Sequence, residues 1–289
     1  LFTTSGIEDK TVPYDSSFSY HGFKYGSLIM YERCLEMGIP TGWRPFYNTG
    51  HTLDNNKFKQ DSCIQSMAAW LFTQLNIVKS TNKEGVFRYE KEIHVFDSLN
   101  ATENYSDKSI LFLGSSYIRL WKNIKEDIKY KDVIQRGFGG CNLRDVAYYI
   151  KRIVYPINPK AIFIYVGNDI TANDKDKTPE QVLELYKYIV KIIRQKHLNI
   201  PITWLAISPS EKRWSKWKEI QKANELIKTF SESNPNLHYI DSSNKFLGKD
   251  GHPIISLYRD DKLHYNEAGY TVWGKNIRRQ VKKISKYSI

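Results

Sequence analysis

Two short stretches of the sequence carry residues that could act together on an ester bond. Ser115 and Ser116 follow a short apolar run that ends at Gly114. A serine hydroxyl is a weak nucleophile unless a neighbouring base removes its proton. Asp261 lies three residues before His264, a spacing that lets a carboxylate orient the imidazole through Nδ1 and leaves Nε2 free to take that proton. We therefore interpret the chain as a hydrolase with Ser116 as its nucleophile.

Two further stretches could stabilise the negative charge that develops on an ester oxygen during hydrolysis. Gly137, Gly139 and Gly140 lie in one loop, and glycines let backbone N–H groups converge on a bound oxygen without obstruction by side chains. Asn168 and Asp169 follow another apolar run and could either cap a turn or point an amide into the site.

Each stretch also has a purely structural explanation when it is taken alone. Ser115 or Ser116 could be a helix N-cap that accepts a hydrogen bond from free backbone N–H groups. The glycines could form a tight turn, and an aspartate three residues before a histidine is more often a surface pair than a catalytic one. The combination of all four stretches is what favours catalysis.

The pattern between these stretches predicts a parallel sheet that positions them. The apolar run before Gly114 lacks polar alternation, as in a strand buried on both faces. We expect strands at 110–113, 133–136, 161–166, 202–207 and 237–240, and helices at 143–153, 179–197, 214–233 and 266–283. This alternation predicts an α/β fold, a three-layer α/β/α sandwich with a parallel, flavodoxin-like five-stranded sheet. In such folds ligands bind at the carboxyl ends of the strands.

Taken in order, the four stretches resemble the sequence blocks of the SGNH, or GDSL-like, hydrolase family over about residues 87–286. The resemblance implies Ser116 as nucleophile, His264 as general base and Asp261 as the acid that orients the histidine. It also implies an oxyanion hole formed by the backbone N–H groups of Ser116 and Gly140 and by the side-chain amide of Asn168.

The sequence departs from the family pattern in two of these blocks. Ser115 stands where the GDS motif has aspartate, and Gly-Ser-Ser before an Ile-Arg-Leu-Trp run resembles a branch of the family. In the third block Gly167 directly precedes Asn168, whereas the family has G-x-N-D. Either one residue is missing there, or Val166 takes the place of the glycine.

Residues 1–78 resemble the C-terminal end of an α/β-hydrolase domain. We expect a small βαβα segment there, with strands at 1–4 and 43–47 and helices at 25–37 and 62–75. GIEDKTVPY is similar to the loop with the acid of that fold and NTGHTLDN to the loop with its histidine, which implies Asp9 as acid and His51 as base. The alternative is that Asp9 is a turn residue and His51 an ordinary loop histidine. The chain has no G-x-S-x-G serine. We therefore expect the tail of an upstream esterase domain, with Asp9 and His51 taking no part in activity, then a linker and leading helix at 79–109 and an SGNH domain at 110–289.

Composition narrows the range of partners. The formal net charge is +12, but the basic residues are spread along the chain, which favours a solvated basic surface over a nucleic-acid site. Attraction to an acidic polysaccharide is a further hypothesis. No apolar run is long enough to span a bilayer, and Cys34, Cys63 and Cys141 show no metal-ligand spacing. We therefore expect no membrane contact, no metal and no cofactor.

Asn-x-Ser/Thr sites at Asn100 and Asn104 fall in a polar stretch interpreted as the linker, and we expect a secreted or periplasmic protein.

These observations and resemblances predict a serine esterase that removes short acyl groups, above all acetyl, from a carbohydrate such as acetylated xylan. Trp121, Trp214, Trp217 and Trp273 could stack on sugar rings, although apolar helical spacing favours core packing for Trp121 and Trp273. One alternative is a lysophospholipase or thioesterase, which would need a long apolar groove. Another is a non-catalytic carbohydrate-binding module with a vestigial site.

Overall fold

The structure is a computed structural model that describes residues 2–6, 16–19, 22–25, 42–46 and 87–286. The chain divides into two compact units, Leu1–Gly85 and Val86–Ile289. No helix among the described residues is both long and apolar enough to cross a bilayer.

Two pairs of short strands are described in the first unit. β1 (Phe2–Gly6) pairs in parallel with β4 (Gly42–Phe46), close to the strands expected at 1–4 and 43–47. β2 (Ser16–Ser19) and β3 (Gly22–Tyr25) form an antiparallel hairpin that the sequence reasoning missed. Its signal is the alternation of aromatic with polar residues over 16–25. Most of the helix expected at 25–37, the whole of that at 62–75, and Asp9, His51, Cys34 and Cys63 lie outside the described residues.

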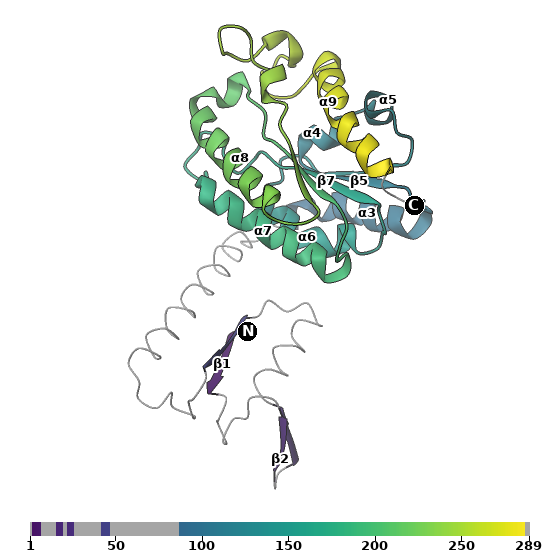
Figure 1. Cartoon of the computed structure of the whole chain (residues 1–289), viewed down its shortest axis with the longest axis vertical. Helices are drawn as coiled ribbons and strands as arrows, with labels where there is room; N and C mark the ends of the chain where they lie inside the picture. Colours follow the sequence, from purple (N-terminus) through teal and green to yellow (C-terminus); the bar gives the residue numbers. More distant parts are fainter. Residues whose placement is uncertain (1, 7–15, 20–21, 26–41, 47–86, 287–289) are drawn as a thin grey trace. The chain divides into compact units, whose positions relative to one another are not determined.

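The second unit is built on a five-stranded parallel sheet, as the sequence predicted (Figure 1). Its strands are β5 (Ile110–Gly114), β6 (Val133–Gly137), β7 (Ala161–Tyr165), β8 (Ile202–Leu205) and β9 (Leu237–Ile240). They lie in the order β6-β5-β7-β8-β9, and every neighbouring pair is parallel. Each strand lies within two residues of its predicted position.

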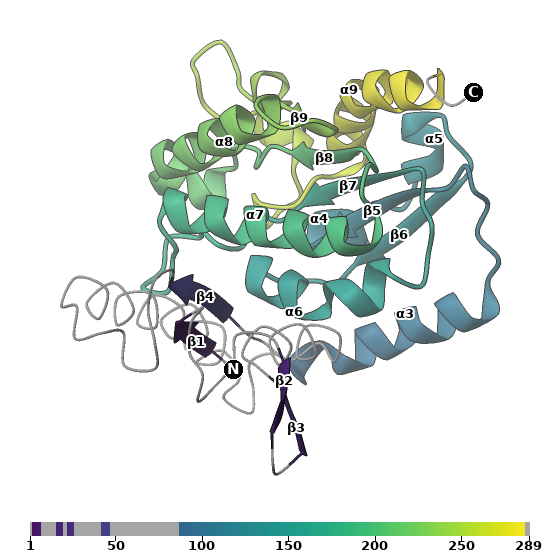
Figure 2. The ribbon, with the colours of Figure 1, turned by 60° about the horizontal axis from the view of Figure 1, so that its bottom comes forward.

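Helices cover both faces of this sheet (Figure 2). One core cluster packs the sheet against α3 (Glu90–Thr102), α6 (Leu143–Val154), α7 (Pro179–Lys196) and α8 (Trp217–Glu232). The other packs it against α4 (Ser116–Arg119), α5 (Ile124–Ile128) and α9 (Glu267–Lys286). The 3-10 segments are η3 (Phe87–Tyr89), η4 (Glu211–Lys216), η5 (Ser243–Lys245) and η6 (Ile255–Leu257).

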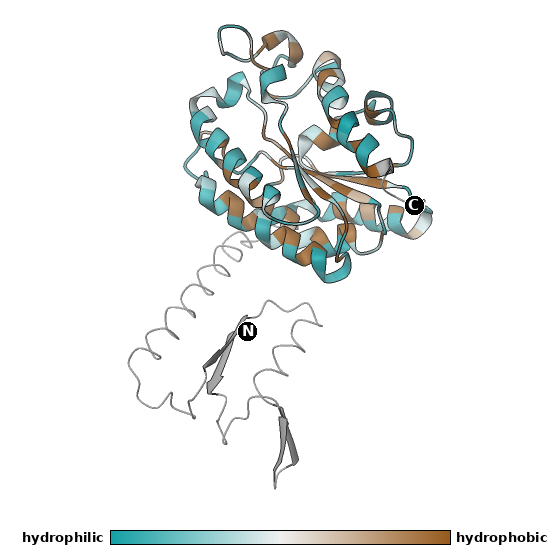
Figure 3. Cartoon of the chain, in the orientation of Figure 1, coloured by the Kyte–Doolittle hydropathy of each residue, from teal (hydrophilic) through white to brown (hydrophobic). Residues whose placement is uncertain are grey.

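The two central strands supply apolar side chains to both core clusters. Phe112 of β5 and Phe163 of β7 stack at 4.8 Å in the cluster that includes α9, whereas Leu111 and Ile162 face the opposite cluster. Burial on both faces explains why these strands show no polar alternation in the sequence. The helices present apolar residues inward and polar residues outward (Figure 3).

Local signals in the sequence account for where the helices begin. Thr178 and Gln181 form a capping box before α7, whose first residue is Pro179, as expected from the residue types.

Asn100 lies within α3 rather than in a linker, because the helix extends to Thr102. Its amide donates to the Arg152 carbonyl at 3.4 Å, whereas Asn104 lies beyond the helix and is exposed.

Candidate active site

The candidate site lies where three neighbouring strands end. The chain runs from β5 to β6 on one side and then to β7 on the other, so the carboxyl end of β5 is the topological switch point of the sheet. Gly114, the last residue of β5, is in register with Gly137 of β6 and Tyr165 of β7. Loops that follow these three residues therefore start side by side.

The turn after β5 depends on the absence of a side chain at Gly114. Its φ is +155°, and a Cβ there would lie 1.9 Å from the Tyr165 carbonyl oxygen. The backbone N–H of Ser115 donates to the same oxygen at 3.1 Å. This close approach to β7 turns the chain sharply and makes Ser116 the first residue of α4.

The structure brings the three residues of the predicted triad together. Ser116 Oγ lies 2.8 Å from His264 Nε2, and His264 Nδ1 lies 2.6 Å from Asp261 Oδ2. Ser116 is 8% exposed, and the His264 and Asp261 side chains are 20% and 47% exposed. A neutral imidazole that donates from Nδ1 to the carboxylate can accept the serine proton at Nε2.

Asp261 also orders the backbone that precedes the histidine. Its Oδ1 accepts from the N–H groups of Leu263 and His264, both at 2.9 Å. Burial acts to raise the pKa of Asp261, but its hydrogen bonds with the His264 side chain and these two N–H groups outweigh burial and lower the pKa below its usual value. The carboxylate is therefore charged at neutral pH and can stabilise a protonated imidazole.

Tyr117 connects the loop of the histidine to the helix of the nucleophile. It is buried beside Ser116, and its hydroxyl donates to the Leu263 carbonyl. Its ring centroid lies 5.6 Å from that of His264, and its own carbonyl accepts from the Tyr270 hydroxyl at 2.9 Å. Sequence reasoning missed this role, because a tyrosine in an apolar helix pattern resembles any core aromatic.

The three expected oxyanion donors follow three adjacent strands. The backbone N–H groups of Ser116 and Gly140 have no acceptor among the described residues. Gly140 has a φ of +82°, a conformation that glycine adopts without strain. The Asn168 side chain donates to the Cys141 carbonyl at 2.9 Å, which uses one of its two N–H hydrogens and leaves the other for a ligand.

A buried arginine holds the Asn168 amide in this orientation. Arg213 of η4 is 6% exposed and donates to both Gly167 O and Asn168 Oδ1, each at 2.5 Å. With Oδ1 fixed by a cation, the amide nitrogen must point the other way. A single arginine among 43 basic residues gives no sequence signal for this contact.

Asp169 anchors the same loop from its other side. Its buried Oδ2 accepts from the Leu143 N–H at 2.9 Å, and its Oδ1 pairs with Lys177 Nζ at 2.8 Å. Asp169 therefore binds the first residue of α6, while Asn168 points its amide towards the Gly140 loop through Cys141.

The structure distinguishes the two neighbouring serines, Ser115 and Ser116, by the contacts of their hydroxyl groups. Ser115 is the N-cap residue of α4, but its side chain makes no capping hydrogen bond, whereas the Ser116 hydroxyl contacts His264. Cys141 is fully buried, and burial raises the pKa of its thiol well above the usual value. An un-ionised, inaccessible thiol is a poor nucleophile, so the geometry favours Ser116 over both neighbours.

The tryptophans noted in the sequence divide between core and surface. Trp121 and Trp273 are fully buried and stack at 4.8 Å in the core, as their spacing predicted. Trp217 is also buried and stacks on the partly buried Trp214 at 6.1 Å. Trp214 contacts the His252 ring at 4.9 Å. Because the other three are buried, Trp214 is the most accessible of the four.

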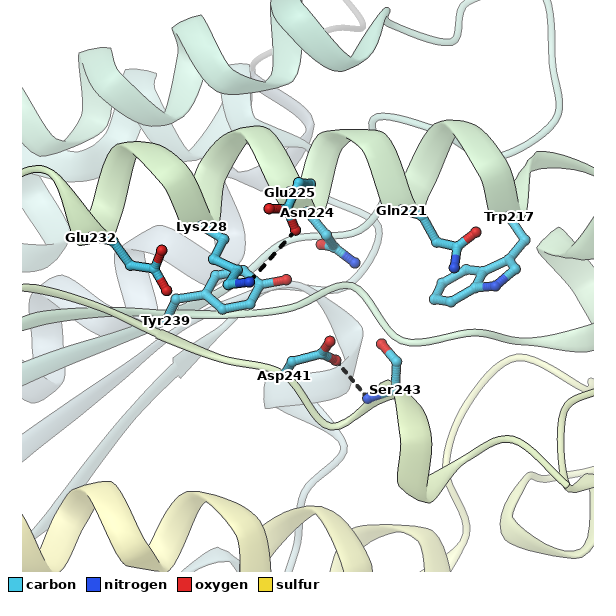
Figure 4. Close-up of a pocket in the computed structure, with 9 residues that line it drawn as sticks. All are labelled: Trp217, Gln221, Asn224, Glu225, Lys228, Glu232, Tyr239, Asp241 and Ser243. Atoms are coloured by element: carbon cyan, nitrogen blue, oxygen red, sulfur yellow. Dashed lines mark hydrogen bonds and ion pairs between the residues drawn. The ribbon is translucent and has the colours of Figure 1, made fainter. Parts of the chain in front are cut away.

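A separate hollow lies along α8 and β9 (Figure 4). Its volume is about 390 Å³, and neither Ser116 nor His264 lines it. The residues drawn there are mostly polar, with the rings of Trp217 and Tyr239 among them. Among the described residues, no three His, Cys, Asp or Glu side chains gather as metal ligands.

Comparison with known proteins agrees with this geometry. The model of the GDSL-like Lipase/Acylhydrolase family matches residues 101–272, more than half of the 289 residues. The chain belongs to the GDSL-like lipase/acylhydrolase family. The resemblance inferred from the four sequence blocks is thus confirmed, and as a GDSL-like acylhydrolase the protein is assigned to ester hydrolysis. No curated protein matches the chain.

Solved structures share the GDSL-like fold at low sequence identity. A Streptococcus pneumonia protein, provisionally called a platelet activating factor, is 20% identical, has a TM-score of 0.59 and covers 75% of this chain and 99% of its own. A GDSL-like lipase from Bacteroides thetaiotaomicron is 18% identical, with a TM-score of 0.57 and coverages of 66% and 97%. A carbohydrate esterase family 3 protein from Talaromyces cellulolyticus is 17% identical, with a TM-score of 0.52 and coverages of 63% and 100%.

Proposed function

We propose that this GDSL-like acylhydrolase is a serine esterase that removes acetyl groups from a carbohydrate. The observation that carries the proposal is the continuous hydrogen-bonded chain from Ser116 Oγ through both nitrogens of His264 to Asp261 Oδ2. Because a serine so placed is within reach of a base that a carboxylate orients, it can form an acyl-enzyme.

The first half of the proposed reaction acylates the serine. Ser116 Oγ attacks the ester carbonyl carbon while its proton passes to His264 Nε2, and the carbonyl oxygen becomes an oxyanion. The free N–H groups of Ser116 and Gly140 and the second N–H of Asn168 supply donors for this oxyanion. The intermediate then collapses, and the alcohol leaves with the proton from His264.

The second half repeats these steps with water in place of the serine. His264 takes a proton from water, the hydroxide attacks the acyl-enzyme, and the same donors hold the second oxyanion. Collapse releases acetate and returns the proton to Ser116 Oγ. Loss of one oxyanion donor typically costs about 3 kcal/mol of transition-state stabilisation, or roughly a hundredfold in rate.

Polar groups around Ser116 support a carbohydrate rather than a lipid substrate. A Cβ placed on Gly140 would lie 3.5 Å from the hydroxyl of Tyr89, and one placed on Gly139 would lie 2.6 Å from the guanidinium carbon of Arg119. Tyr89 is buried, whereas the Arg119 side chain is exposed. An exposed guanidinium beside the glycine loop suits sugar hydroxyl groups better than an acyl chain. The fold relative from Talaromyces cellulolyticus is a carbohydrate esterase, so this architecture is compatible with such substrates.

Hydrolysis of p-nitrophenyl esters tests the proposal. Wild type should hydrolyse p-nitrophenyl acetate at least a hundredfold faster than Ser116→Ala, and Ser115→Ala should keep most of the activity. A rate for wild type no higher than that of Ser116→Ala would refute the catalytic role and favour a non-catalytic binding module. A higher kcat/KM for the octanoate than for the acetate would favour the lysophospholipase or thioesterase alternative over an acetyl esterase.

A further inference from the structure

One basic side chain beside the nucleophile takes no part in the acyl-transfer steps described above. Arg119 is the last residue of α4 and lies three positions after Ser116, so both project from neighbouring positions on the helix. Its side chain is exposed, and its guanidinium has no hydrogen-bond or ion-pair partner among the described residues.

The position of this guanidinium is set by the glycine loop. A Cβ on Gly139 would lie 2.6 Å from both Cζ and Nη2 of Arg119 and 2.8 Å from Nε. The guanidinium therefore occupies the space that any other residue at 139 would fill. Gly140, whose N–H is a proposed oxyanion donor, is the next residue along the chain. Arg119 thus brings a positive charge next to the place where the ester carbonyl would bind.

Other arginines of this unit illustrate what a structural guanidinium does. Arg152 pairs with Glu90 and Asp97 across two helices, and Arg213 is buried on Gly167 and Asn168. Arg119 makes no such contact in the described part of the chain. A guanidinium is weakly hydrated, and its planar donors match the oxygens of a carboxylate or phosphate in pairs.

We propose that Arg119 binds an anionic group, a carboxylate or a phosphate, on the alcohol portion of the substrate. This inference rests on the proposed ester hydrolysis and defines the substrate class of the same site. An acetyl group carries no charge, so the anion has to belong to the alcohol that leaves. The net charge of +12 would also attract an acidic substrate before it reaches the site.

A matched set of three sugars tests this inference. The substrates are methyl glucoside, methyl glucuronide and methyl glucoside 6-phosphate, each acetylated at the same ring hydroxyl, and the readout is acetate release. They differ only at C6. The glucoside has a neutral hydroxyl group there, the glucuronide a carboxylate and the 6-phosphate a phosphate ester. The quantity compared is the ratio of kcat/KM for each anionic sugar to that for the neutral one, and p-nitrophenyl acetate serves as an independent substrate for ester hydrolysis.

Four variants identify the source of any preference. Arg119→Met removes the charge, whereas Arg119→Lys keeps the charge but loses the paired donors. Gly139→Ala moves the guanidinium aside, because the obstructing atoms are the flexible end of a side chain. Lys122→Met is the matched control: it removes one positive charge from an exposed residue three positions further along. Circular dichroism melting curves establish that each variant is folded.

Wild type should prefer at least one anionic sugar about tenfold, as expected when a charge-assisted hydrogen bond is made. The ratio should fall close to one in Arg119→Met, fall partly in Arg119→Lys and Gly139→Ala, and stay near the wild-type value in Lys122→Met. A preference for the glucuronide identifies the anion as a carboxylate, and one for the 6-phosphate identifies a phosphate.

Two results would overturn the inference while ester hydrolysis stands. One is hydrolysis of p-nitrophenyl acetate with no preference for either anionic sugar. The other is a preference that survives in Arg119→Met. If wild type hydrolyses neither p-nitrophenyl acetate nor any of the sugars, the proposed function itself fails, and the inference that rests on it fails with it.

Discussion

Removal of the Arg213 side chain tests whether this residue acts through the Asn168 amide. Arg213→Met keeps much of the aliphatic volume but deletes both donors, which lie 2.5 Å from Gly167 O and Asn168 Oδ1. The amide can then rotate and exchange its oxygen with its nitrogen. We therefore expect kcat to fall while KM changes little, because Arg213 is a positioning residue with no proposed contact to the substrate.

The size of the effect follows from the contacts that remain. Complete loss of one oxyanion donor costs about 3 kcal/mol, which sets the loss expected for Asn168→Ala. Arg213→Met leaves the amide in place with its 2.9 Å hydrogen bond to the Cys141 carbonyl, a contact worth about 1 kcal/mol in favour of the native orientation. We expect a loss of about 1–2 kcal/mol in transition-state stabilisation, or roughly a five- to thirtyfold fall in kcat.

A double-mutant cycle on p-nitrophenyl acetate provides the assay. Arg213→Met should lower kcat in the wild-type background but have little further effect in the Asn168→Ala background, because the two residues act as one unit. Urea denaturation of each variant should show that Arg213→Met, which leaves two acceptors unpaired, loses about 1–3 kcal/mol of stability and remains folded. An equal fall in kcat in both backgrounds, or no fall in either, would refute the positioning role.

Three other substitutions give independent tests. Asp261→Asn should lower kcat by about 10²–10⁴, because an amide cannot stabilise the protonated His264 as a carboxylate does. Because the folded pKa of Asp261 is lowered, its contribution to stability is present above the usual carboxyl pKa and lost as pH falls through the folded pKa. The melting temperature of Asp261→Asn should therefore fall less than that of wild type between pH 5 and pH 3, and an equal fall would contradict this. Gly114→Ala should lose more than about 3 kcal/mol of stability or fail to fold, since its Cβ would lie 1.9 Å from the Tyr165 oxygen; a melting curve like that of wild type would be the opposing result. His51→Ala should retain the wild-type kcat, and a folded variant without activity would show that residues 1–78 contribute to catalysis.

The sheet and the triad could be predicted because local patterns specify them. Strands buried on both faces, such as Ile110–Gly114, have an unbroken apolar sequence, and the box formed by Thr178 and Gln181 marks where a helix begins. The carboxyl ends of parallel strands lie at one edge, so residues after successive strands must meet there. Together with the other three stretches, the spacing of Asp261 and His264 predicts that Nδ1 of the imidazole faces the acid.

Contacts between distant loops could not be predicted in this way. Arg213 reaches residues 45 and 46 positions earlier in the chain, and Tyr117 bonds to a carbonyl 146 positions later. Neither residue stands out from its neighbours in type or spacing. Only the three-dimensional fold determines which distant segments come into contact. The same holds for Arg119. Its guanidinium fits beside Gly139, in the loop after β6, because Gly139 has no Cβ.

Covalent labelling of the nucleophile tests the central claim most directly. The protein is incubated with a fluorophosphonate, which phosphonylates an activated serine, then digested, and the modified peptide is sequenced by mass spectrometry. We predict one adduct, on Ser116, that His264→Ala abolishes along with the hydrolysis of p-nitrophenyl acetate. An adduct on Ser115 would contradict the account. So would inactivation by the fluorophosphonate that leaves Ser116 unmodified.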